Sequence, residues 1–228
     1  AEEVGTTEFT GYSGHEGEGR VLALVKNGTR VDSAQAGDEV TIITNQTPFY
    51  GESGGQMGDA GNVRNDSGLE AIVNDTSKPL GRLHAHHATV KSGAIKVGDA
   101  VRQEVDADRR TRIRANHSAT HLLHAALRHR LGGHVTQKGS LVAPDRFRFD
   151  FSHPKALTTE DIEAIEAEVN AHIRENQTVT TRLMSPDEAI AAGAMALFGE
   201  KYGDEVRVLS MGRGGEASYS VELCGGTH

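Results

Sequence analysis

The stretch NHSATH at residues 116–121 places two histidines, His117 and His121, four positions apart. Residues i and i+4 of a helix project from the same face, so both imidazoles can reach one metal ion. Apolar side chains recur on the opposite side of the same helix, at residues 122–127. The pattern predicts a helix that starts near residue 107 and ends at Gly132. On this helix His117, His121, His124 and Arg128 form one narrow stripe, which either carries ligands or is merely solvated.

A second pair of candidate ligands lies in CGGTH at residues 224–228. Cys224 and His228 are again four apart, and the two glycines between them allow a turn that brings thiol and imidazole to the same point. Three imidazoles and one thiolate suit Zn²⁺ in tetrahedral geometry. A chance histidine pair is common in a chain with 12 histidines. The coincidence of both pairs favours a shared metal site.

Short strands separated by glycine and polar turns fill the first part of the chain. The strand candidates are residues 20–26, 39–44, 69–74 and 85–91. Turn chemistry such as Asn27-Gly28 separates them. We therefore predict an α+β protein in which residues 1–106 form a small β-barrel-like domain.

Helices and strands alternate in residues 107–228, which we expect to form an α+β domain with helices packed on an antiparallel sheet. RFRFDF at residues 146–151 alternates as a half-buried strand does. A helix is predicted to open at residues 158–161, and another at Ser185, which is expected to run toward Phe198. Further strands are predicted at residues 177–184, 205–211 and 217–223.

The most unusual part of the predicted barrel is TPFYGESGGQMGD, at residues 47–59. It lacks the Gly-Lys-Ser/Thr of a P-loop. Its glycines let the backbone approach a ligand and expose N–H groups to it. A tight hairpin connection is the structural alternative. The candidate ligand-contacting residues are Glu52, Ser53, Gly54, Gly55 and Gln56.

Composition indicates a soluble chain, with 36% hydrophobic and 4% aromatic residues. No apolar run approaches the roughly 20 residues that span a bilayer. A lone cysteine excludes an internal disulfide and the first residues lack a signal-peptide pattern, so we expect a cytoplasmic protein with no membrane partner. The missing initiator methionine suggests processing or a fragment of a longer protein.

One dense basic run precedes the histidine helix, and it contains Arg109, Arg110, Arg112 and Arg114. The net charge of −8 argues against nonspecific capture of a nucleic-acid backbone. A local RNA contact through Arg109, Arg110 and Arg112 stays open. The alternative is a solvated face paired with acidic neighbours.

Six stretches carry a family resemblance. They are residues 47–59 (TPFYGESGGQMGD), 116–127 (NHSATHLLHAAL), 134–142 (HVTQKGSLV), 148–153 (RFDFSH), 193–203 (GAMALFGEKYG) and 222–228 (ELCGGTH). Together they resemble the editing domain of bacterial alanyl-tRNA synthetases. Related threonyl-tRNA synthetase domains and free-standing editing proteins share the HxxxH and CxxxH pairs, but the loop and GAMALFGEKYG fit the alanine enzyme better. Gly51 stands where alanine is expected, a change that should leave the site intact.

The resemblance implies hydrolysis of the ester that joins a wrong amino acid, serine or glycine, to the 3′ end of alanine tRNA. The implied partners are that tRNA and the remainder of the synthetase chain. Zn²⁺ would be held by His117, His121, Cys224 and His228. Its role is either to polarise water or to position substrate, and positioning is favoured because four protein ligands leave no open position.

The resemblance also implies roles for residues outside the ligand set. Gln137 matches the family's glutamine near the pocket and is the candidate for the amino-acid hydroxyl or the attacking water. The glycine-rich loop would cover the terminal adenosine, with Thr227 as a further candidate.

Two other functions stay open. One is a zinc-stabilised RNA-binding or interdomain module without catalysis, and the other is a free-standing editing hydrolase that acts in trans. A zinc protease is disfavoured because no glutamate follows His117 to serve as base.

Overall fold

The computed structural model describes residues 5–194, 204–212 and 218–228. Contacts divide the chain into two compact units. The first comprises residues 1–113 and Thr227, and the second comprises residues 114–226 and His228. The expected boundary after residue 106 is where the last barrel strand gives way to the first helix, whereas the contact boundary lies within that helix.

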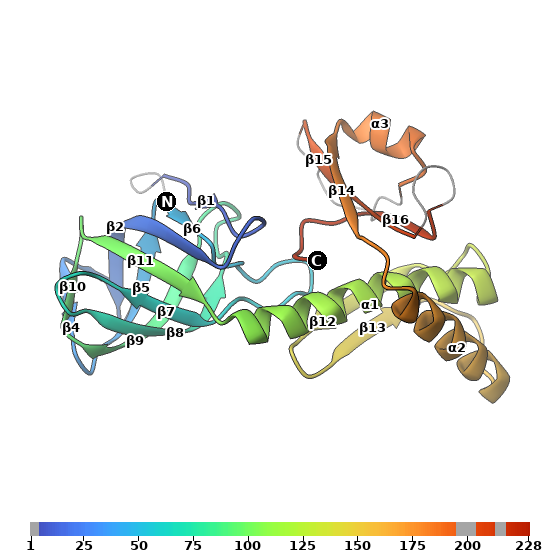
Figure 1. Ribbon diagram of the computed structural model, residues 1–228, viewed down its shortest axis with the longest axis horizontal. Coiled ribbons are helices and arrows are strands. Elements are labelled where there is room, and N and C mark those ends of the chain that lie inside the picture. Colours follow the sequence, from blue (N-terminus) through green and yellow to red (C-terminus); the bar gives the residue numbers. More distant parts are fainter. Residues whose placement is uncertain (1–4, 195–203, 213–217) are drawn as a thin grey trace. The chain divides into compact units, whose positions relative to one another are not determined.

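Six strands of the first unit close into an antiparallel barrel (Figure 1). The strands of this unit are β1 (Glu8–Phe9), β2 (Glu16–Lys26), β3 (Thr29–Val31), β4 (Ser33–Gln35), β5 (Glu39–Thr44), β6 (Gln46–Thr47), β7 (Gly61–Arg64), β8 (Glu70–Ser77), β9 (Ala85–Ser92), β10 (Ala94–Lys96) and β11 (Ala100–Val105). Hydrogen bonds follow the order β11-β7-β8-β9-β5-β2, and β11 pairs with β2 as well. The predicted barrel-like fold is therefore confirmed.

Alternation along the strands builds the barrel core. In β11, Val101, Gln103 and Val105 are buried while the residues between them are exposed. The apolar ones join a cluster that includes Leu24 and Ile42. Because each apolar side chain removed from water contributes about 1.5–3 kcal/mol, this shared interior stabilises the closed sheet.

The strand β2 begins at Glu16, four residues earlier than predicted. The residues Glu16-Gly17-Glu18-Gly19 do not look like a strand in the sequence, because glycine has low β propensity. Packing nevertheless requires glycine at position 19. A Cβ at Gly19 would lie 2.5 Å from the Nε2 of the buried Gln103 on β11.

The second unit combines helices with two small antiparallel sheets. Its elements are α1 (Ala107–Leu131), which starts in the first unit, β12 (Gln137–Val142), β13 (Phe147–Phe151), α2 (Thr159–Glu175), β14 (Thr180–Met184), α3 (Pro186–Ala191), β15 (Val206–Met211) and β16 (Ser220–Leu223). β12 pairs with β13, and β14, β15 and β16 form a three-stranded sheet. This confirms the expected α+β class.

The central strand β15 is covered on both faces. Val206 and Val208 pack with Ala189 of α3, which Figure 1 shows beside the three-stranded sheet. Leu209 and Met211 point the other way and share a cluster with side chains of α1 and α2. Neither helix nor sheet of this unit could bury its apolar side alone.

Both predicted capping boxes are present, at Thr158 before α2 and at Ser185 before α3. α3 ends at Ala191, however, and Gly193 follows with a φ of +79°. The expected continuation to Phe198 lies outside the described residues. Ile162 of α2 is spaced three and seven residues from the buried Ile165 and Val169, and yet it is 44% exposed. Among the described helices, none combines the length and apolar character that crossing a membrane requires.

Stability of the barrel should fall as the pH drops below about 6.5. Burial lowers the pKa of both His84 and His86 to about 4. Nδ1 of His86 donates to the carbonyl of Ile42 at 2.8 Å, so Nε2 of the neutral ring accepts from Thr47 Oγ1 at 2.8 Å. In the unfolded chain a histidine has a pKa near 6.5, so between about pH 6.5 and pH 4 it binds a proton that it does not bind in the folded barrel. Each histidine therefore lowers the free energy of unfolding by up to about 3 kcal/mol at pH 4.

Amide hydrogen exchange of β5 and β9 between pH 7 and pH 4 measures this loss within the barrel. The variant His86→Gln should lose less protection than the unchanged protein over the same range. Equal pH dependence in both proteins would rule out His86 as a source of the acid sensitivity.

Candidate metal centre

Helix α1 supplies two histidines from adjacent turns of one face. His117 and His121 are 6% and 7% exposed, and their rings stack with centroids 5.2 Å apart. His124, in the same stripe, is 4% exposed. The solvated alternative for this stripe is therefore wrong, because the second unit covers it. The apolar side predicted opposite is also buried, with Ala126 fully so.

The turn after β16 supplies the other two groups. Arg207 of β15 holds its backbone, with Nη1 donating to the carbonyls of Cys224 at 3.2 Å and Gly226 at 2.9 Å. The N–H of Gly226 donates to the Cys224 sulfur at 3.4 Å. Arg114 donates to the carbonyl of His228. A glycine-containing turn with these anchors returns the chain so that both side chains face one point.

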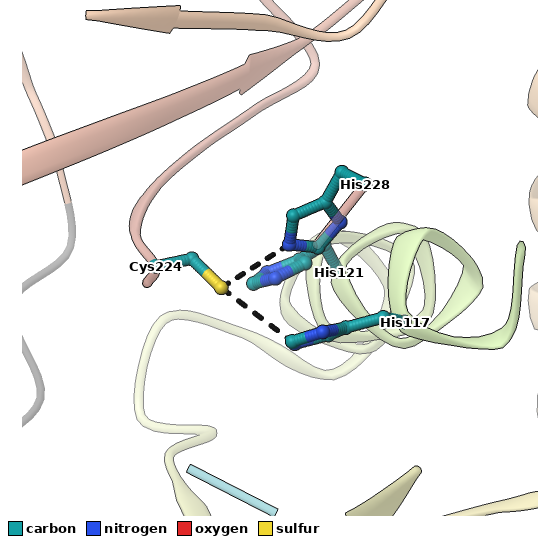
Figure 2. Close-up of side chains that lie close together, drawn as sticks. All are labelled: His117, His121, Cys224 and His228. Carbon is teal, nitrogen blue, oxygen red and sulfur yellow. Dashed lines mark hydrogen bonds between the residues drawn. The ribbon is translucent and has the colours of Figure 1, made fainter. Parts of the chain in front are cut away.

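Figure 2 shows the four side chains converging from α1 and from this turn. The sulfur of Cys224 lies 3.2 Å from His228 Nε2 and 3.6 Å from His117 Nε2. One donor atom from each of His117, His121, Cys224 and His228 lies within 4.8 Å of all the others. A tetrahedral zinc site with bonds of about 2.0–2.3 Å separates its donors by about 3.3–3.6 Å. The cluster could therefore bind a metal ion.

The protonation states of Cys224 and His228 suit a cation. Burial would lower the pKa of His121, but Cys224 and Glu222 raise it to about 10, so a bound ion would have to displace a proton there. Burial alone would raise the pKa of the Cys224 thiol, but the neighbouring imidazoles of His117, His121 and His228 lower it. Burial lowers the pKa of His228 to about 4. A thiolate beside a neutral imidazole is the state that a metal requires of these ligands. The buried Nε2 of His121 has no hydrogen-bond partner among the described residues, and a bound ion would satisfy it.

Glu222 is the residue that sequence reasoning missed. Its carboxylate accepts from Nδ1 of His121 at 2.9 Å and from Nδ1 of His124 at 3.1 Å. Burial alone would raise the pKa of this carboxyl, but the two imidazoles lower it to about 2. Strand alternation was the available signal, because Glu222 and Cys224 are two apart and face the same side.

The glycine-rich loop makes a tight turn in the first unit. Ser53 and Gln56 exchange backbone hydrogen bonds of 3.2 and 3.0 Å around Gly54 and Gly55, whose φ angles of +59° and +87° favour glycine. Glu52 and Ser53 are exposed. The hairpin alternative thus describes the geometry of this segment, and a ligand-binding role for its backbone stays a prediction.

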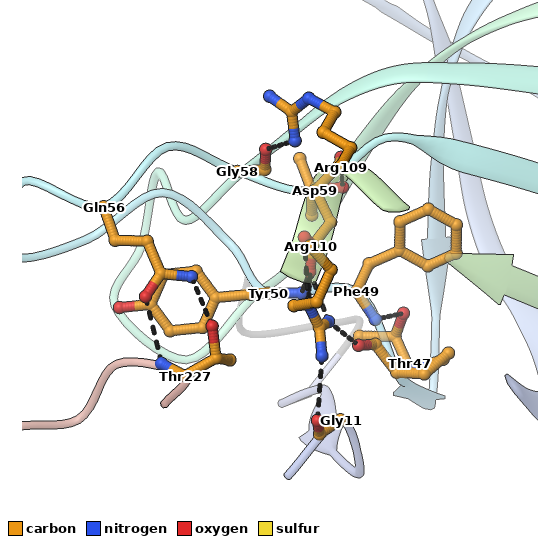
Figure 3. Close-up of polar contacts among 12 residues, drawn as sticks. Gly11, Thr47, Phe49, Tyr50, Gln56, Gly58, Asp59, Arg109, Arg110 and Thr227 are labelled. Atoms are coloured by element: carbon orange, nitrogen blue, oxygen red, sulfur yellow. Dashed lines mark hydrogen bonds and ion pairs between the residues drawn. The ribbon is translucent and has the colours of Figure 1, made fainter. Parts of the chain in front are cut away.

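Two predicted contact residues of the first unit bind each other. Gln56 is fully buried, its Nε2 donates to Thr227 Oγ1 at 2.8 Å, and the N–H of Thr227 donates back to Oε1 at 3.0 Å (Figure 3). The side-chain amide of Gln56 is therefore engaged within the protein. A ligand-contacting role for Glu52 and Ser53 stays a prediction.

Arg110 is the largest fully buried side chain of the structure's described part. Its guanidinium donates to Asp59 through Nε and Nη2, to the carbonyl of Gly11 at 2.9 Å and to the carbonyl of Pro48 at 2.7 Å (Figure 3). The solvated-face interpretation fails for this residue, and burial removes it from the expected RNA contact. Arg109 is half-buried, with Nη1 on the carbonyl of Gly58, and Arg112 is exposed.

Gln137 begins β12 and is half-buried. The register of β12 against β13 shifts between Gln137 and Gly139. Such a bulge re-aims a side chain relative to the rest of its strand. The orientation of Gln137 is thus set by an irregular point in the hairpin, and its role in catalysis stays a prediction.

Sequence comparison shows which known proteins this chain is similar to. A sequence model of the family "tRNA synthetases class II (A)" matches residues 1–109, essentially the barrel unit. An alanine–tRNA ligase of Rhizorhabdus wittichii is 75% identical over 232 residues, which cover 100% of this chain and 26% of that protein. Over its whole length the chain is similar to a segment of alanine–tRNA ligases.

Two further alanine–tRNA ligases align over both units. The ligase of Sphingopyxis alaskensis is 71% identical, covering 100% of the chain and 26% of that protein. The ligase of Granulibacter bethesdensis is 58% identical, covering 99% of the chain and 26% of that protein. The chain therefore spans about a quarter of the length of these alanine–tRNA ligases, and the metal cluster lies outside the residues that the family model matches.

Proposed function

We propose that this segment of an alanine–tRNA ligase hydrolyses the ester of serine or glycine mischarged onto alanine tRNA. The observation that carries the proposal is the cluster of three histidines and one cysteine in a chain similar to alanine–tRNA ligases. The chemistry explains the need for such a site. A pocket for alanine discriminates against one methyl fewer or one hydroxyl more by only about 1–3 kcal/mol.

The ion proposed for the cluster is Zn²⁺, because one thiolate and three imidazoles are ligands it favours. Bound there, it would supply positive charge that orients or polarises a substrate group. His117, His121, Cys224 and His228 would all be used in holding it. Four protein ligands favour orientation of the substrate over activation of water.

The side-chain amide of Gln137 both donates and accepts hydrogen bonds. It can therefore bind the serine hydroxyl, which alanine lacks, or hold the attacking water. The loop around Gly54 and Gly55 is proposed to contact the terminal adenosine, and Arg109 and Arg112 the tRNA backbone. The proposed partners are the 3′ end of alanine tRNA and the remainder of the synthetase chain, in the cytoplasm.

A second candidate is a zinc-stabilised RNA-binding module without catalysis. The closed set of four protein donors favours it, because structural zinc sites are commonly four-coordinate while catalytic ones keep an open position. The two candidates differ in whether a polar residue outside the ligand set controls turnover.

Release of serine from serylated alanine tRNA, measured beside alanylated tRNA, tests the proposed hydrolysis. The purified protein should release serine and spare alanine, and removal of metal with a chelator should abolish release. Absence of serine release by the folded, zinc-loaded protein would favour the binding module.

Gln137→Ala should lower the rate constant for serine release by about 100-fold or more, since it removes the group proposed to contact the serine hydroxyl or the attacking water. Zinc content and the unfolding midpoint should stay unchanged. The matched control is Gln177→Ala, which removes a half-buried glutamine from the same unit. Equal release rates in the two variants would exclude a catalytic role for Gln137.

A further inference from the structure

The carboxylate of Glu222 lies between two histidines of one helix. Glu222 is 6% exposed, and its Oε2 accepts from His121 while its Oε1 accepts from His124. Ser220 Oγ donates to the same Oε1 at 3.2 Å. Three donors from α1 and β16 therefore hold this carboxylate in one orientation.

This arrangement determines which nitrogen of His121 faces the cluster. A carboxylate only accepts hydrogen bonds, so the proton of the neutral imidazole lies on Nδ1. The lone pair then lies on Nε2, the buried atom that has no hydrogen-bond partner among the described residues. Ser118 Oγ contacts the Nδ1 of His228 at 3.2 Å, and the Nε2 of that ring faces the Cys224 sulfur.

Charge gives Glu222 a second effect. A divalent cation bound by one thiolate and three neutral imidazoles would carry a net charge of about +1, and an uncompensated buried charge is costly. The carboxylate adjoins a ligand without being one of the four donors. Its negative charge would bring the net charge of the buried metal site to about zero. It would also make Nε2 of His121 a stronger electron-pair donor to the metal ion.

We propose that Glu222 is a positioning residue of the metal centre, which orients His121 and neutralises the bound cation. The role of Glu222 rests on the metal site in the proposed function. It acts through His121, with His124 and Ser220 holding its other oxygen.

The test compares Glu222→Gln with the unchanged protein, using Co²⁺ and Zn²⁺ as probes in competition with a chelator of known affinity. Glu222→Gln should bind both ions about 10–100-fold more weakly, because loss of an outer hydrogen-bond partner weakens metal binding to that extent. The visible absorption of bound Co²⁺ should also change, since the spectrum reports ligand geometry.

Glu168→Gln is the matched control. The Glu168 carboxylate also accepts from a histidine of α1, His129 Nδ1 at 2.9 Å, and from Tyr219 at 2.7 Å. His129 is not a member of the metal cluster. Glu168→Gln should therefore bind Co²⁺ with the same affinity and the same absorption spectrum as the unchanged protein.

Glu222→Asp keeps the negative charge but shortens the side chain by one methylene, which moves the carboxylate away from His121. The metal affinity of this variant should lie between those of Glu222→Gln and the unchanged protein. Unchanged affinity and spectrum in a folded Glu222→Gln would overturn the positioning role. Should that variant not fold, the same result in Glu222→Asp would overturn it.

Serine release by the unchanged protein separates this inference from the proposed function. Weaker metal binding by Glu222→Gln supports the positioning role even where the unchanged protein releases no serine, an outcome that overturns hydrolysis alone. Failure of the unchanged protein to bind either ion would overturn the positioning role itself.

Discussion

Asp59→Asn should destabilise the barrel unit by about 3–5 kcal/mol, the effect expected when one partner of a buried ion pair is removed. Asp59 and Arg110 are both about 1% exposed. Asp59 also accepts from the N–H of Tyr50 at 2.7 Å, so the carboxylate joins the glycine-rich segment to the start of α1. Urea unfolding followed by circular dichroism measures the loss.

Glu70→Gln provides the comparison, because the Arg64–Glu70 pair of the same unit is about half exposed on both sides. Its loss should cost less than about 1 kcal/mol. Combining Asp59→Asn with Arg110→Gln should cost less than the sum of the single changes, since the double variant leaves no unpaired buried charge. A cost of Asp59→Asn no larger than that of Glu70→Gln would contradict the structural role assigned to Arg110.

Cys224→Ser should weaken zinc binding by about 100- to 1,000-fold, since an apparent binding free energy of about 10–16 kcal/mol is shared among four ligands. The hydroxyl that replaces the thiol is a poor ligand because it stays protonated and is harder than sulfur. Serine release should fall with zinc content at any fixed zinc concentration. Zinc content after gel filtration and competition with a chromogenic chelator measure the change.

His129→Gln is the control that tests whether a substitution outside the cluster also weakens zinc binding. His129 is exposed and lies on the same helix as His117 and His121 but outside the cluster. It should retain zinc and activity. An unchanged zinc affinity of Cys224→Ser in the chelator competition would show that the sulfur is no ligand, and the proposed metal centre would be wrong.

Much of the fold could be predicted because local patterns carry it. Alternation along β13 and the capping boxes of α2 and α3 depend on neighbouring residues. Closure of the barrel could not be derived, because it depends on the pairing of β11 with β2, whose residues lie far apart in the sequence. The glycines in the first half of β2 hid its extent for a local reason, their low strand propensity.

The ligand pairs could be predicted because each lies within five consecutive residues. The burial of Arg110 could not, since it depends on Asp59, 51 positions away, and on two backbone carbonyls from other loops. Strand alternation could have predicted that Glu222 faces the same side as Cys224. The sequence placed His124 on the histidine stripe of α1 but gave no sign that it contacts Glu222. Long-range polar pairing has no periodic signature, so buried charges are the features that sequence patterns reveal least.

Closure of the barrel also bears on how copies of the chain associate. Each of its six strands is hydrogen-bonded on both sides, so the only free backbone row of this sheet, within the described residues, belongs to the short β3 beside β2. The three-stranded sheet of the second unit differs, because β14 is an outer strand there and its Leu183 is 64% exposed. Aggregation from partly opened molecules should therefore start at β14.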